Sequence, residues 1–63
     1  MTPKQALDKA IKKVGTRYAL AKGINLSPQA VLKWTRVPPA RVLAVEKLTG
    51  VSRHDLRPDI YPK

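Results

Sequence analysis

Apolar residues recur every three or four positions in several short segments, and glycine or proline separates the segments. This period is that of an amphipathic helix, whereas a half-buried strand alternates every second residue. The pattern predicts an all-α fold with five short helices and a tail. We place the helices at residues 3–14, 17–23, 28–35, 39–49 and 53–56, and the tail at 57–63.

Capping residues mark the starts and stops of these helices. Thr2, Pro3 and Gln5 have the form of a capping box, in which Thr2 caps the helix and Gln5 reaches back to the cap amide. Thr16 and Ser27 are N-cap candidates for the second and third helices. In the second half, Gly50 ends the fourth helix, Ser52 caps the fifth and Pro58 keeps it short; these residues stand at the predicted boundaries.

Three residues at fixed spacing join the second and third helices into a helix-turn-helix, from Thr16 to Thr35. Ala21 is small enough to let the two helices cross closely. Asn25 tolerates the left-handed conformation that a tight turn needs, although most such motifs carry glycine there. Val31 is a buried anchor on the third helix, and Trp34 shares its inner face. The spacing is that of a domain that binds double-stranded DNA.

Charge strengthens this interpretation. The 63 residues make one small domain, 1–63, in which 13 Lys and Arg face 4 Asp and Glu, for a formal net charge of +9. Such a field attracts polyanions, and nucleic acid is the usual partner. Solubility alone is the plainer explanation. A basic helix on a membrane surface requires larger apolar faces than a chain with one Trp, two Tyr and no Phe presents.

Several chemistries are excluded by composition. The absence of cysteine removes disulfides and thiolate metal sites, and His54 alone cannot build a zinc site. No apolar run reaches the roughly 18 residues of a membrane span, and the charged N-terminal segment is not a signal peptide. The acids stand apart, without a nucleophile elbow or phosphate loop. We therefore expect no enzyme, no cofactor, no metal, no small-molecule ligand and no membrane association, but a cytoplasmic protein.

The chain resembles the Cro repressors of lambdoid phages and the related YdaS-like prophage antitoxins at residues 15–22, 26–34, 38–46, 48–50 and 53–62. The resemblance covers nearly the whole chain. It implies a domain of the lambda-repressor-like type in a bacterial host cell. Some Cro proteins replace the last two helices with a β-hairpin, but the helical spacing from Val42 to Leu48 and the Gly50 stop favour the all-helical branch.

In this interpretation the third helix lies in the major groove with its N-terminal part against the bases. Gln29 is the first candidate for base reading, because its amide pairs with the edge of adenine. Lys33 reaches guanine or a phosphate, Leu32 meets thymine methyls, and Ser27 and Pro28 meet a methyl or the backbone. The alternative is that Gln29 and Lys33 are plain surface residues.

Other side chains hold phosphates without reading sequence. We expect them at the start of the second helix and beside the third: Thr16, Arg17, Tyr18, Lys22 and Arg36. Arg41 and Arg53 either contact phosphates or are solvated surface charges, and the sequence does not decide between these roles. His54 next to Asp55 is expected to be a surface pair at a capped turn.

A single helix-turn-helix reads few base pairs, so we expect a dimer on an inverted repeat with half-sites about 34 Å apart. Ile60 and Tyr61 either fold back on the first and fourth helices or meet a second chain; we expect them to fold back, with a weak homodimer strengthened on DNA. The leading function is a phage transcriptional repressor acting on an operator. The alternative is a YdaS-like antitoxin or protein-interaction module that also binds DNA. RNA binding is disfavoured by the lack of an exposed aromatic platform.

Overall fold

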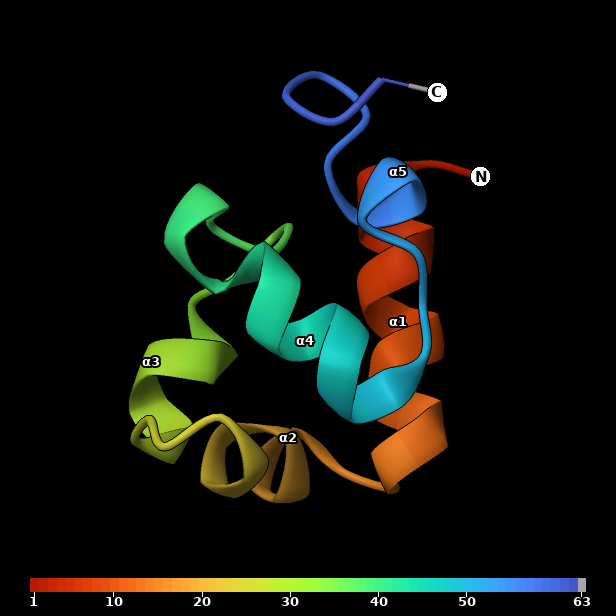
Figure 1. Ribbon diagram of the computed structural model, residues 1–63. Helices are drawn as coiled ribbons and strands as arrows, with labels where there is room; N and C mark the ends of the chain where they lie inside the picture. Colours follow the sequence, from red (N-terminus) through yellow and green to blue (C-terminus); the bar gives the residue numbers. More distant parts are fainter. Residues whose placement is uncertain (63) are drawn as a thin grey trace.

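Five short α-helices and one 3-10 turn follow one another along residues 1–62, the part of the chain that the computed structural model describes (Figure 1). In chain order they are α1 (Pro3–Val14), α2 (Arg17–Gly23), α3 (Pro28–Leu32), the 3-10 turn η1 (Pro39–Arg41), α4 (Val42–Thr49) and α5 (Arg53–Leu56). The predicted all-α fold with five helices is confirmed. Lys63, the end of the predicted tail, lies outside the described residues. Within them, no helix is long and apolar enough to cross a membrane.

The third helix is shorter than the predicted 28–35, since it ends at Leu32. The carbonyl of Val31 accepts the amide of Trp34, three residues on, at 3.0 Å. It also accepts Nη1 of Arg17 at 3.2 Å. A bond to the third residue tightens the final turn and ends the regular i+4 ladder.

The predicted fourth helix, 39–49, divides into η1 and α4. The first backbone bond of this segment runs from Arg41 N to Pro38 O at 2.9 Å and closes a 3-10 turn. Arg41 then leaves the regular helical conformation, with φ −115° and ψ −1°, before α4 begins. The conformation of Arg41 therefore separates a short turn from the helix proper.

The hydrophobic core lies where the five α-helices meet, and Figure 1 shows α4 at the centre with α1 on one side and α3 on the other. Leu7 of α1, Leu20 of α2 and Leu56 of α5 are its largest side chains, each 1% exposed or less. Burying one such leucine contributes about 1.5–3 kcal/mol. Trp34 and Tyr61 are partly buried and pack against this cluster. The core thus fixes the inner faces of the helices that carry the site.

Arg57 ties the C-terminal segment to the chain that follows α3. Its side chain is buried, and Nη1 donates to the carbonyl of Val37 at 3.1 Å. Nε and Nη2 donate to the carboxylate of Asp59 at 2.9 and 2.7 Å. These hydrogen bonds from Arg57 hold the pKa of Asp59 at about 2, below its ordinary value of 3.8. We call Arg57, Asp59 and Val37 the C-terminal clamp.

The last described residues divide between the core and the solvent. Nδ1 of His54 lies 2.8 Å from the carbonyl oxygen of Tyr61, and the guanidinium of Arg53 lies 5.8 Å from the centre of the Tyr61 ring. Ile60, by contrast, is 42% exposed. The expectation that both apolar tail residues fold back is right for Tyr61, which packs against the core and lies beside α5, and wrong for Ile60, which stays exposed.

Candidate nucleic-acid interface

The segment from α2 to α3 forms the helix-turn-helix that the sequence predicts. Ala21 and Val31 are fully buried between the two helices. Asn25 has φ 62°, and it is the single non-glycine residue with positive φ among those described. The bond from Leu26 N to Ala21 O, 2.8 Å long, closes the turn. The predictions for Ala21, Asn25 and Val31 are therefore confirmed.

The five residues predicted to read bases lie together on and beside α3. Ser27 caps the helix, because its Oγ accepts the amide of Ala30 at 3.3 Å. Gln29 and Lys33 are exposed, and Pro28 is partly buried. Leu32 is 63% exposed, although it is one of the large apolar side chains. α3 and its C-cap Lys33 thus present an amide, an apolar side chain and an ammonium group to the outside.

The residues predicted to hold phosphates are less uniform. Tyr18, which is 63% exposed, lies on α2 with the exposed Lys22, and the exposed Arg36 follows α3. Thr16 is exposed, but its hydroxyl caps α2 by accepting the amide of Ala19 at 3.0 Å. Arg17 is half-buried and already donates to Val31, as described above. The group therefore contains three free-standing polar side chains and two that also hold the local structure.

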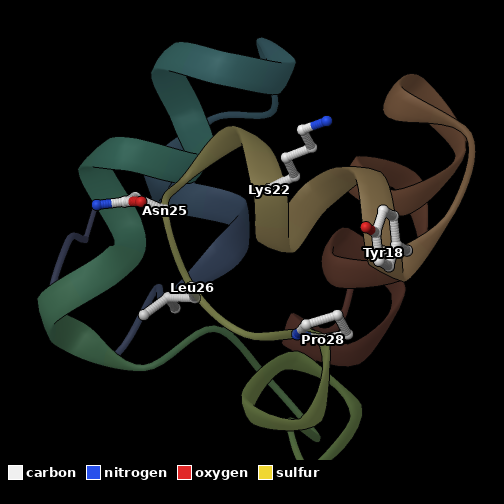
Figure 2. Close-up of a pocket in the computed structure, with 5 residues that line it drawn as sticks. All are labelled: Tyr18, Lys22, Asn25, Leu26 and Pro28. Carbon is white, nitrogen blue, oxygen red and sulfur yellow. The ribbon is translucent and has the colours of Figure 1, made fainter.

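An open hollow of about 230 Å³ lies between α2 and the start of α3. Figure 2 shows Tyr18 and Lys22 rising from α2, Asn25 and Leu26 on the turn, and Pro28 opening α3. Sequence reasoning missed Leu26 as part of this surface. The sequence feature that could have identified Leu26 is its position between the turn residue Asn25 and the cap Ser27, which places it beside the hollow.

Acidic residues are absent from the segment that forms this surface, although Asp59 lies near enough to Arg36 for that cation to help lower its pKa. Residues 9–45 contain no Asp or Glu, but they contain eight cations: Lys9, Lys12, Lys13, Arg17, Lys22, Lys33, Arg36 and Arg41. Glu46 begins the acidic part, and its carboxylate accepts the amide of Arg53 at 2.6 Å. No group of three or more potential metal ligands occurs among the described residues. The charges of the helix-turn-helix are therefore not compensated by carboxylates of its own segment.

Comparison with known proteins agrees with this geometry. The family described as Bacterial toxin YdaS matches residues 7–63. Among solved structures, the Cro protein from the putative prophage element Xfaso 1 of Xylella fastidiosa strain Ann-1 is similar, with 35% sequence identity and a TM-score of 0.86. The match covers 92% of this chain and 97% of that Cro protein. No curated protein matches significantly. The chain therefore belongs to the bacterial toxin YdaS family and has the fold of a prophage Cro protein.

Proposed function

We propose that the protein is a phage or prophage transcriptional repressor of the Cro type, which binds an operator in double-stranded DNA inside the bacterial host. The observation that carries this proposal is the exposed face of α3 within an acid-free, cationic segment. A helix of this size fits the major groove, and the surrounding cations attract phosphates. The similar prophage Cro protein supports a regulator of this class.

Base reading is assigned to the outer face of α3. Gln29 is exposed at the second position of α3. Its amide N–H is therefore free to donate to N7 of adenine, while its amide oxygen accepts from the N6 amino group. Leu32 contacts thymine methyls, which removes its exposed apolar surface from water. Lys33 reaches guanine or a phosphate. Ser27 and Pro28 contact a methyl or the backbone.

Phosphate contacts are assigned to the side chains around this face. Lys22 and Tyr18 reach one strand from α2, and Arg36 reaches the backbone from beyond the end of α3. Thr16 offers its hydroxyl at the start of α2. Arg17 contributes as well, because a guanidinium has five N–H donors and only one nitrogen is bound to Val31. These contacts fix the register without reading sequence.

The operator is an inverted repeat, bound by a homodimer that is weak in free solution and stronger on DNA. One α3 presents few base-reading side chains, so two copies are needed for a specific site. Leu43 and Ile60, which are 51% and 42% exposed, remain available on the C-terminal half for contact with a second copy. Neither a cofactor nor a catalytic step enters this function.

Selection from a randomised pool of duplex DNA tests the proposal. The selected duplexes are sequenced and rebound at two salt concentrations, with random duplex as the matched control. We expect enrichment of an inverted repeat whose centres are about one helical turn apart. If no sequence is enriched and binding is only salt-sensitive, the protein is a non-specific DNA binder or acts on another protein.

A second candidate is a role in a toxin–antitoxin pair, as antitoxin or as a protein-interaction module that also binds DNA. The family description, which names a toxin, favours it. Induced expression tests the toxic role that the family description names: growth arrest that persists in a Gln29→Ala variant supports a toxic protein interaction. Unchanged growth together with operator binding fits both a repressor and an antitoxin, and a pull-down from the host separates them: a co-purified toxin supports the antitoxin, and its absence supports the repressor.

A further inference from the structure

Arg17 makes the one hydrogen bond between a side chain of α2 and the backbone of α3 among the described residues. It is the first residue of α2, and its Nη1 donates to the carbonyl of Val31 at 3.2 Å, 14 residues away in the chain. The side chain is half-buried. It therefore spans from the start of the first helix of the motif to the last turn of the second.

α3 is a helix that needs such external support. It has five residues, a length at which an isolated helix is not stable in water. Its last turn contains no basic residue, and its C-cap is Lys33 rather than a glycine. The Val31 carbonyl already accepts the amide of Trp34, but a carbonyl oxygen has a second lone pair for another donor. A cation that donates to a carbonyl of the last turn also suits the helix dipole. Arg17 supplies that cation from another element.

The position of this carbonyl matters for the outer face of α3. Val31 points into the core, while Gln29 and Leu32 are on the exposed side of the same short helix. A rotation of the helix about its axis, pivoting on Val31, moves the ends of Gln29 and Leu32 relative to α2. The bond from Arg17 restrains that rotation at the end of the helix away from the Ser27 cap.

We propose that Arg17 is a positioning residue, which holds α3 in the orientation required for base reading and so sets sequence preference in addition to any phosphate contact. The inference rests on the proposed DNA-binding function. The two roles have different consequences. Loss of a phosphate contact weakens operator and random DNA alike and lowers the salt slope by about one. Loss of positioning lowers the preference for the operator.

The decisive variant is Arg17→Lys, because it retains the positive charge but replaces the planar guanidinium with a shorter single-centre donor. Arg17→Met removes both the charge and the donor. Lys22→Met is the matched control: it removes an exposed cation on the same helix that makes no hydrogen bond among the described residues. Each variant is measured for the ratio of dissociation constants on operator and random duplex, at two salt concentrations, after thermal melting has established that it is folded.

We expect Arg17→Lys to lower the operator preference by on the order of tenfold, the equivalent of one charge-assisted hydrogen bond, with the salt slope unchanged. In the Arg17→Lys variant without DNA, we expect the NMR signals of the Val31 to Trp34 amides to shift and their hydrogens to exchange faster with solvent. Lys22→Met is expected to lower the salt slope and leave the preference unchanged. Arg17→Met is expected to lower both the salt slope and the operator preference.

Two outcomes overturn the inference, and they are distinguishable. If the unmodified protein prefers an operator and Arg17→Lys keeps that preference with unshifted α3 amides, Arg17 is not a positioning residue, whereas the proposed function stands. If the unmodified protein shows no preference for any duplex, the proposed function is wrong, and the inference about Arg17 is wrong as well. Should Arg17→Met fail to fold, Arg17→Lys alone decides.

Discussion

The helix-turn-helix and the C-terminal clamp each use an arginine that donates to a distant backbone carbonyl, but the two arginines have different surroundings. Arg57 is 7% exposed and forms two hydrogen bonds with the carboxylate of Asp59. Arg17 is half-buried, and no carboxylate pairs with it among the described residues. The charge of Arg57 is compensated within the protein, whereas that of Arg17 is left for an external anion.

This difference extends to the two regions as a whole. The four acids are all outside residues 9–45, so the C-terminal half contains three of them and the helix-turn-helix none. A buried charge is tolerated when it is paired and hydrogen-bonded, which is the condition met in the clamp. An uncompensated cationic surface costs self-repulsion and draws polyanions. Stability and DNA affinity should therefore respond to mutations in different regions.

The largest expected effect is that of Arg57→Ala on stability. It leaves the carbonyl of Val37 without its partner at a buried position and removes the packing of the arginine stem. We expect a loss of about 3 kcal/mol in the free energy of unfolding, at the low end for a broken buried pair because the Asp59 side chain is 46% exposed. Denaturant unfolding measures it. Arg41→Ala, at an exposed position, is the control, and an equal loss in both variants contradicts a special role for the clamp.

Gln29→Ala is the converse change, in the other region. Gln29 is exposed, so its loss should alter the free energy of unfolding by no more than about 0.5 kcal/mol. Operator binding should weaken by about 1–3 kcal/mol, with relaxed preference at one base pair. Titration against operators substituted at each position measures this. A uniform loss on all sequences shows that Gln29 does not read a base.

Local chemistry explains why much of the fold is predictable from sequence. The capping box of Thr2 and Gln5 forms in both directions, at 3.1 and 2.9 Å, because its two partners are three residues apart. Asn25 adopts the left-handed turn because few residue types tolerate it. Val31 is buried because the helical period places it on the inner face.

The unpredicted features are contacts between a long side chain and a distant backbone carbonyl. Every residue carries a carbonyl, so nothing in the sequence marks Val31 as the acceptor for Arg17 or Val37 as the acceptor for Arg57. The early end of α3 is unpredictable for the same reason, since the Val31 carbonyl accepts both the amide of Trp34 and the side chain of Arg17. The exposure of Gln29, Leu32 and Lys33 on and beside α3 was predictable from the helical period, whereas the support of α3 by Arg17 required the structure.

Acid should weaken the clamp through Asp59. Its pKa is about 2 in the folded protein and 3.8 ordinarily, so the folded state prefers the ionised form. The stabilisation is complete above pH 3.8 and is lost as the pH falls through 2. Asp59→Asn should therefore flatten the dependence of the unfolding free energy on pH in that interval. Asp8→Asn, on the exposed surface of α1, is the control, and an unchanged pH dependence in Asp59→Asn would falsify the assignment.

The smallest expected effect lies where the two regions meet, at Gly23. A Cβ added there would lie 2.5 Å from Cδ2 of Leu48, a side chain of α4 that is 40% exposed and has room to turn away. Alanine also favours the helix over glycine by up to about 1 kcal/mol. The two effects oppose each other, so Gly23→Ala should change the free energy of unfolding by less than about 0.5 kcal/mol. In a Leu48→Ala background the contact is gone, and Gly23→Ala should then stabilise by about 0.5–1 kcal/mol. Equal effects in both backgrounds would show that the Leu48 side chain does not couple α2 to α4.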